Sequence, residues 1–138
     1  MTQPRLVSVV DDDESVRESL PDLLKVLGFA AQTFSSAEAF LASDYIDQTK
    51  CLILDIALPG MTGLDLQHEL RLRHKEIPII FITARRDETV RQQTLGQGAV
   101  EFLYKPFSDM ALLEALNVAF QADGRPHPSA DPARFRDS

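Results

Sequence analysis

The chain has 138 residues, of which 44% are hydrophobic and 25% charged, values typical of one globular domain and unlike those of disordered or collagen-like chains. Its 21 acidic residues outnumber 14 Lys and Arg, and the net charge of -7 argues against direct binding to nucleic acid or anionic membranes. A single cysteine, the lack of a membrane-length apolar run and the lack of a signal-peptide pattern lead us to expect a cytoplasmic protein.

Short apolar runs alternate with segments of helical periodicity five times along the chain. Repeated βα units are typical of a parallel sheet with helices on both faces, and right-handed crossovers favour the strand order 2-1-3-4-5. We therefore predict a flavodoxin-like α/β fold, a doubly wound (βα)5 parallel sheet. The predicted units are a strand at 6–10 with a helix at 14–27, a strand at 30–34 with a short helix ending at 42, a strand at 51–55 with a helix at 64–73, a strand at 78–83 with a helix at 87–95, and a strand at 101–104 with a helix ending near 120.

Capping residues mark the predicted helix starts. Asp13 and Ser108 are predicted N-caps, and the spacing of Ser35 and Glu38 predicts a capping box at the short second helix. Pro21 falls near the middle of the first predicted helix, where a proline removes a backbone donor and costs about 3 kcal/mol or more. Either the helix tolerates a kink on its solvent side, or its predicted start is wrong.

Polar side chains stand at the carboxyl ends of four of the five predicted strands. Asp11 and Asp12 follow the first strand, Asp55 ends the third, Thr83 ends the fourth, and Lys105 follows the fifth. In an open α/β sheet, ligands bind in the crevice outside these strand ends, so we expect the five side chains to converge in one pocket.

The residue types in this pocket suit phosphoryl transfer with a hard divalent cation. Close carboxylates raise one another's pKa, and Mg²⁺ relieves that repulsion; we predict Asp12 and Asp55 as direct ligands and Asp11 as a ligand through water. Asp55 can then act as a nucleophile that forms an aspartyl-phosphate, with Lys105 and the Thr83 hydroxyl against the phosphoryl oxygens. The alternative is that Asp55 merely ends a strand and pairs with Lys105.

Four stretches resemble the signature motifs of a two-component response-regulator receiver domain. They are VVDDDESVR at 9–17, LILDIALPGMTGLDL at 52–66, IIFITAR at 79–85 and GAVEFLYKPF at 98–107. The resemblance covers about residues 5–120 and is strongest to the FixJ-like subgroup, which shows a similar SAEAFL stretch and a KPF followed by an acidic helix start. It implies that Asp55 accepts phosphoryl from a kinase phosphohistidine. It also implies that Asp11 and Asp12 hold Mg²⁺ together with the main-chain carbonyl of Ala57.

The resemblance further implies a switch. On phosphorylation Thr83 moves toward the phosphoryl group and Phe102 rotates inward, which remodels the face made by the fourth helix, fifth strand and fifth helix. A partner or a second copy of the chain would bind there. Alternation along the fifth strand aims Phe102 and Tyr104 to the same outward side, so we predict that Tyr104 is exposed and belongs to the interaction face. Alternatively, Tyr104 is a lone surface aromatic.

Two features depart from the family pattern. Ala57 stands where larger or polar residues often tune the dephosphorylation rate. Arg85 and Arg86 follow Thr83, where many FixJ-like receivers have Gly-His. Their charge either attracts the phosphodonor or an acidic partner surface, or it is simply solvated.

Three functions follow, of which we favour the first. In it, the chain is a signalling domain that takes phosphoryl from a sensor histidine kinase or a phosphotransfer protein, with self-catalysed phosphotransfer and autodephosphorylation but no other enzyme activity. The second is an aspartyl-phosphate phosphatase of the haloacid dehalogenase kind, which needs a second Asp where Ala57 stands. The third is a receiver-like interaction module that works without phosphorylation.

The domain organisation leaves the output open. We expect residues 1–120 to form the receiver and residues 121–138 to be a disordered tail or a linker, because the composition shifts there to Gly, Pro, Ser, Asp and Arg. FixJ-like receivers usually precede a helix-turn-helix domain that controls transcription. The chain is therefore either a stand-alone receiver or a piece that lacks a C-terminal DNA-binding domain.

Overall fold

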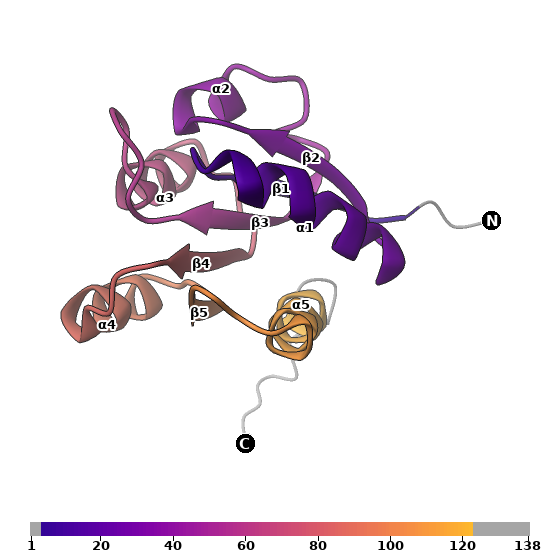
Figure 1. Ribbon diagram of the computed structural model, residues 1–138. Coiled ribbons are helices and arrows are strands. Elements are labelled where there is room, and N and C mark those ends of the chain that lie inside the picture. The colour runs from indigo at the N-terminus through magenta and orange to yellow at the C-terminus, as the bar shows by residue number, and fades with distance from the viewer. Residues whose placement is uncertain (1–3, 123–138) are drawn as a thin grey trace.

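The computed structural model describes residues 4–122, in which five strands alternate with five helices. The strands are β1 (Leu6–Val10), β2 (Ala30–Phe34), β3 (Thr49–Asp55), β4 (Ile79–Thr83) and β5 (Glu101–Tyr104). The helices are α1 (Glu14–Val26), α2 (Ala37–Leu41), α3 (Gly63–Leu72), α4 (Glu88–Gly96) and α5 (Asp109–Ala122). All strand pairs are parallel and the sheet order is β2-β1-β3-β4-β5, so the predicted fold class and strand order are confirmed (Figure 1).

Helices cover both faces of the sheet, with α1 and α5 on one face and α2, α3 and α4 on the other (Figure 1). Successive strand residues point to opposite faces, so Ile53 packs with Leu24 of α1 and Leu116 of α5. Leu54 packs on the other side with Phe40 of α2. Within the described residues, no helix has the length and apolar character needed to cross a membrane.

The central strand β3 is apolar on both sides until its last residue. Cys51, Leu52, Ile53 and Leu54 are fully buried, because neighbouring strands flank β3 and helices cover both of its faces. Cys51, the single cysteine of the chain, therefore lies in the core. β3 is therefore a rigid element that carries Asp55 to the carboxyl edge of the sheet.

Some predicted element boundaries are wrong by one or two residues. β3 begins at Thr49 instead of 51, because the buried Thr49 hydroxyl bonds Ser8 Oγ at 2.7 Å and Tyr45 O at 2.7 Å, and these contacts keep a polar residue inside the sheet. α3 begins at Gly63, where Thr62 and Asp65 form a capping box. α5 ends at Ala122, two residues beyond the predicted end. Residues 123–138, most of the predicted tail, lie outside the described residues.

The predicted capping box of α2 is also wrong. Ser36, not Ser35, is the N-cap, and its hydroxyl accepts a hydrogen bond from Ala39 N at 3.0 Å. Glu38 instead accepts a hydrogen bond from Met61 N at 3.0 Å, which links α2 to the loop after β3. Phe40 of this short helix is fully buried in the core on that side of the sheet.

Pro21 lies inside α1, and the predicted helix start at residue 14 is confirmed. Replacing Pro21 with alanine is expected to raise the free energy of unfolding by about 2 kcal/mol. Alanine restores the missing backbone donor and removes the ring clash, which stabilises the folded helix by about 3 kcal/mol. It also gives the unfolded chain more conformational freedom, which offsets about 1 kcal/mol of that gain. Urea unfolding measures the change, with the exposed Glu18→Ala one turn earlier as the control. A loss of stability in Pro21→Ala would mean that the half-buried ring packs better than this account allows.

Candidate functional site

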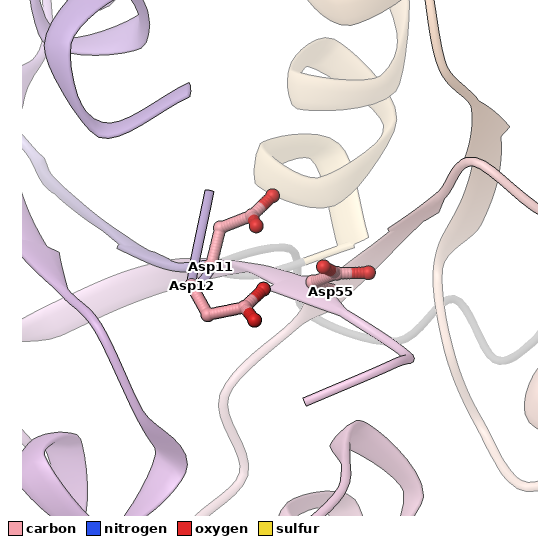
Figure 2. A group of neighbouring side chains, drawn as sticks. All are labelled: Asp11, Asp12 and Asp55. Atoms are coloured by element: carbon pink, nitrogen blue, oxygen red, sulfur yellow. The ribbon is translucent and has the colours of Figure 1, made fainter. Parts of the chain in front are cut away.

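Three carboxylates meet where β1 and β3 end side by side (Figure 2). Asp11 directly follows β1 and is fully buried, Asp12 is exposed, and Asp55 is the last residue of β3 and 5% exposed. One carboxylate oxygen from each residue lies within 4.8 Å of the other two. The structure thus brings together the three acidic side chains that the sequence places at strand ends.

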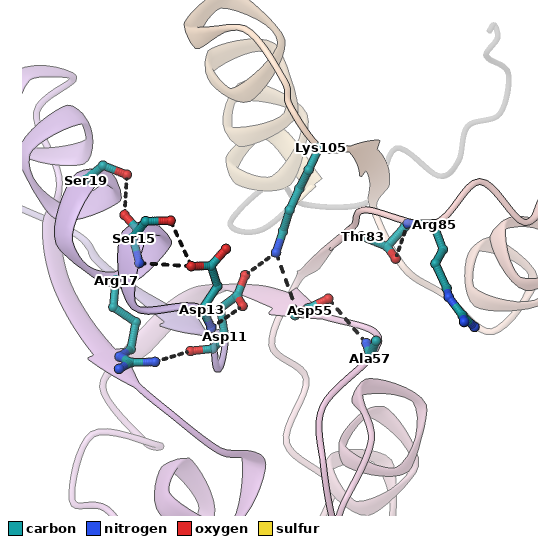
Figure 3. A network of polar contacts seen from close by, with 10 residues as sticks. All are labelled: Asp11, Asp13, Ser15, Arg17, Ser19, Asp55, Ala57, Thr83, Arg85 and Lys105. Carbon is teal, nitrogen blue, oxygen red and sulfur yellow. Dashed lines mark hydrogen bonds and ion pairs between the residues drawn. The ribbon is translucent and has the colours of Figure 1, made fainter.

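Lys105 reaches the same pocket from the loop between β5 and α5 (Figure 3). Its Nζ lies 2.7 Å from Asp11 Oδ2 and 3.6 Å from Asp55 Oδ2. The other oxygen of Asp11 accepts a hydrogen bond from Asp13 N at 2.9 Å. The lysine is therefore paired chiefly with Asp11, which leaves Asp55 the less neutralised of the two buried carboxylates.

Burial and charge set the electrostatics of this cluster. Burial, reinforced by the negative charge of Asp11, raises the pKa of Asp55 to about 6, against the opposing effects of Lys105 and of the Ala57 N–H. Burial alone would lower the pKa of Lys105, but its hydrogen bond to Asp11 and the charge of Asp55 outweigh it, so this pKa is raised. Lys105 is therefore a cation at neutral pH, and Asp55 is a carboxylate that another cation would stabilise.

The loop after β3 packs closely behind Asp55. Ala57 N donates a hydrogen bond to Asp55 Oδ1 at 3.2 Å, which orients the carboxylate. Gly63, the first residue of α3, lies so close that an added Cβ would be 2.5 Å from the main-chain oxygen of Asp55. A side chain at Gly63 would therefore displace the strand end that carries Asp55.

Thr83 ends β4, the strand next to β3, and is 3% exposed. Its hydroxyl accepts a hydrogen bond from Arg85 N at 3.2 Å. Among the described residues this hydroxyl makes no hydrogen bond with the aspartates or with Lys105, whose main-chain N instead donates to the main-chain oxygen of Thr83 at 2.7 Å. Thr83 is thus at the predicted strand end, but its hydroxyl is engaged with its own loop (Figure 3).

The aromatic pair of β5 corrects the prediction of an exposed Tyr104. Phe102 and Tyr104 share one side of the sheet as predicted, but Phe102 is 5% exposed and Tyr104 is half-buried. Their rings meet edge-on at 5.4 Å, and the Arg86 guanidinium lies 4.5 Å from the centre of the Tyr104 ring. The outward side of β5 is covered by α4 and its preceding loop, which alternation within a single strand does not reveal.

Sequence reasoning missed two contacts around the site. Arg17 of α1 donates a hydrogen bond from Nη1 to the main-chain oxygen of Asp11 at 3.0 Å. Arg86, for which the sequence left open a contact with a phosphodonor or acidic partner and a simply solvated charge, covers the Tyr104 ring. The position of Arg17 four residues after the N-cap Asp13 was an available signal, because such a residue lies one turn into the helix and can reach back to the preceding loop.

Comparison with known proteins decides the family. The family model of the response regulator receiver domain matches residues 7–117, which include the three aspartates, Thr83 and Lys105. The chain belongs to the response regulator receiver domain family. This membership favours the receiver over the haloacid dehalogenase hypothesis, in keeping with Ala57 at the position where that chemistry needs a second acid.

The chain is similar to curated proteins that include a nodulation protein and a transcriptional regulatory protein. Nodulation protein W of Bradyrhizobium diazoefficiens is 45% identical over 118 residues, a match that covers 86% of this chain and 52% of that protein. The transcriptional regulatory protein FixJ of Rhizobium meliloti is 39% identical over 113 residues, covering 82% of this chain and 55% of FixJ. The chain therefore spans about half the length of the curated relatives it matches.

Solved structures agree with this placement. The response regulator StyR superposes with a TM-score of 0.80 at 44% identity, covering 87% of this chain and 61% of StyR. The structure of FixJ-N superposes with a TM-score of 0.77 at 37% identity, covering 87% of this chain and 96% of that one. The FixJ-like character expected from the motifs is confirmed.

Proposed function

We propose that this receiver accepts a phosphoryl group on Asp55 from a sensor histidine kinase or a phosphotransfer protein. The observation that carries the proposal is that the Asp55 carboxylate lies beside the carboxylates of Asp11 and Asp12 and 3.6 Å from the Lys105 ammonium. A buried, oriented carboxylate beside a fixed ammonium is suited to attack a phosphorus atom whose oxygens gain charge.

The transfer step exchanges one bond to phosphorus for another. An Asp55 oxygen attacks the phosphorus, the bond between phosphorus and the histidine nitrogen breaks, and the leaving imidazole keeps the electron pair and takes up a proton. Lys105 Nζ, which lies 3.6 Å from Asp55 Oδ2, pairs with the transferred phosphoryl oxygens. In autodephosphorylation water attacks the phosphorus of the acyl phosphate. The bond between phosphorus and the Asp55 oxygen then breaks, which releases inorganic phosphate and restores the Asp55 carboxylate.

The residues present fit a magnesium ion. All three acidic side chains offer hard oxygen donors, and Asp11 Oδ2, buried beside them, has no hydrogen-bond partner among the described residues other than the ion pair with Lys105. Asp12 and Asp55 would hold Mg²⁺ directly, Asp11 through water, and Ala57 through its main-chain carbonyl. Bound there, Mg²⁺ supplies positive charge that neutralises the phosphoryl oxygens and the carboxylates.

A groove beside the site suits the docking of a phosphodonor protein. It has a volume of about 610 Å³, lies between α1 and the loop after β5, and includes Lys105 in its lining. Apolar side chains such as Leu23 and Phe107 supply contact area for a partner helix. A partner seated there would bring its phosphohistidine to the carboxyl edge of the sheet.

The contacts of the loop after β4 suggest how phosphorylation is transmitted. Attraction of the Thr83 hydroxyl to a phosphoryl group would take it from Arg85 N, its present donor. The same loop carries Arg86, which covers Tyr104, so its movement would change the face formed by α4, β5 and α5. Phe102, already buried, would retain or tighten its inward position, and the altered face would bind a partner, an output domain or a second copy.

Thr83→Ala is expected to accept phosphoryl but to lose the response at Tyr104. Without the hydroxyl, nothing draws the loop toward the phosphoryl group, whereas Thr83→Ser keeps the hydroxyl and serves as the matched control. Quenching of Tyr104 fluorescence in a Tyr45→Phe background reports its exposure before and after phosphorylation. A Thr83→Ala protein that responds as strongly as Thr83→Ser would contradict the proposed route.

The output of the complete protein belongs to the same proposal. Several relatives are named transcriptional regulatory proteins and are about twice the length of the matched region. We infer that residues 1–120 form the receiver, that residues from 121 on lead toward an output element, and that the acidic receiver itself does not contact DNA.

Beryllofluoride tests the proposal without a kinase, because it binds a carboxylate as a phosphoryl mimic. Added with Mg²⁺, it is expected to raise the thermal unfolding midpoint of the full chain, because a ligand that binds only the folded state stabilises it. Omission of Mg²⁺ should remove the effect. If high concentrations of beryllofluoride and Mg²⁺ together leave the thermal unfolding midpoint unchanged, the proposed function is overturned.

A further inference from the structure

Arg17 links the first helix to the peptide group that joins Asp11 and Asp12 (Figure 3). The side chain is half-buried, and its Nη1 donates to the Asp11 main-chain oxygen at 3.0 Å. A peptide group is planar, so an anchor on this oxygen restrains the plane from which the Asp12 Cα projects. The contact therefore acts on Asp12 through the backbone.

Asp12 depends on that backbone more than its neighbours do. Both carboxylate oxygens of Asp11 are held, one by Asp13 N at 2.9 Å and the other by Lys105 at 2.7 Å. Asp55 is held by Ala57 N at 3.2 Å. Within residues 4–122, the exposed Asp12 side chain makes no hydrogen bond or ion pair, so its direction follows from the main chain alone.

We propose that Arg17 is a positioning residue that directs the Asp12 carboxylate toward Asp55. This inference rests on the proposed function, because it concerns the Mg²⁺ that Asp12 and Asp55 would share. Like charges within 4.8 Å repel, and the exposed carboxylate can turn into solvent unless its backbone is held. Arg17 keeps the acidic pair arranged before the cation arrives, as outer residues do at other metal sites.

Magnesium titration of three proteins tests this inference. Arg17→Met keeps the aliphatic stem and removes the donors, and Lys25→Met removes the same charge from an exposed position on the same helix. The readout is the Mg²⁺ concentration that gives half of the Mg²⁺-dependent rise in thermal unfolding midpoint, with no phosphodonor present. Arg17→Met is expected to need about tenfold more Mg²⁺. Lys25→Met should match the wild type.

A second readout separates positioning from a merely structural role. Phosphorylation of Arg17→Met by a small phosphodonor should be slow at low Mg²⁺ and recover at saturating Mg²⁺, since Arg17 does not touch the reacting atoms. A variant with a lower Mg²⁺-free midpoint but unchanged Mg²⁺ affinity would overturn the inference. Should Arg17→Met fold poorly, Arg17→Lys, which keeps the charge but lacks the planar donor fork, gives the same comparison.

The response of the wild type to Mg²⁺ separates a failure of this inference from a failure of the proposed function. If the wild type responds to Mg²⁺ and Arg17→Met binds Mg²⁺ with equal affinity, the inference about Arg17 is overturned and the proposed function is not. A wild-type protein that shows no response to Mg²⁺ overturns the proposed function and this inference with it.

Discussion

Asp55→Asn is expected to stabilise the protein at about pH 8 in Mg²⁺-free buffer, by on the order of 1–3 kcal/mol. Asp55 is 5% exposed and faces the negative charge of Asp11, and the substitution removes the charge while keeping the size and one acceptor oxygen. A residue whose natural form lowers stability is typical of a functional site, where the chemistry requires a charge that the fold alone would not retain.

The effect has a defined pH dependence. The folded-state pKa of Asp55 is raised from 3.8 to about 6, so the folded protein holds the proton more tightly than the unfolded chain does. The wild type therefore loses stability as the pH rises from about 4 through 6, and the loss is complete above that range. The gain in Asp55→Asn should be small near pH 4 and reach its full size above pH 6.

Urea unfolding across this pH range measures the gain. Asp22→Asn, which removes one exposed carboxylate from α1, controls for the change in net charge. Addition of Mg²⁺ should raise the stability of the wild type at high pH much more than that of Asp55→Asn, because the substitution removes a proposed ligand. A gain that is independent of pH would show that Asp55 is not destabilised by its own ionisation.

Lys105→Met is expected to lower the free energy of unfolding by about 3–5 kcal/mol near neutral pH. The change removes the cation 2.7 Å from Asp11 Oδ2 and leaves a fully buried carboxylate with no ion-pair partner among the described residues. Because Lys105 also faces Asp55 at 3.6 Å, two like charges then oppose each other without a counter-ion. The same variant should accept phosphoryl slowly, since no ammonium remains beside the phosphoryl oxygens.

A double variant identifies the cause of this loss. Asp11→Asn combined with Lys105→Met removes both members of the buried pair and should recover most of the stability that Lys105→Met loses. Lys50→Met, at an exposed position of β3, controls for the loss of one lysine. If the double variant is no more stable than Lys105→Met, the lysine stabilises the fold by packing instead of by charge.

The sequence predicts the sheet well because its strands are short, apolar and buried on both faces. β5 has the predicted bounds of 101–104, and strand order follows from right-handed crossovers between parallel strands. The error at the start of β3 arises because a polar residue is satisfied by a distant partner. The Thr49 hydroxyl bonds Ser8, 41 residues away, and hydrophobic periodicity does not contain such a contact.

In the candidate site, too, some features follow from the sequence and others do not. Asp11, Asp12, Asp55 and Lys105 meet because parallel strands end at one edge of the sheet, a rule that needs only the strand assignments. The side-chain contacts around them, such as Arg17 on a backbone oxygen, depend on rotamers of long side chains.

Coverage of β5 likewise depends on contacts between elements, here between Tyr104 and the loop that carries Arg86. The pattern within a single strand cannot show which neighbouring element covers it.

Mass spectrometry of the chain after incubation with a small phosphodonor and Mg²⁺ tests the central claim most directly. The account predicts a gain of one phosphoryl group that fragment analysis places on Asp55, that hydroxylamine removes because it is an acyl phosphate, and that is absent without Mg²⁺ or in Asp55→Asn. A phosphoryl group on another residue, or equal labelling of Asp55→Asn, would contradict it.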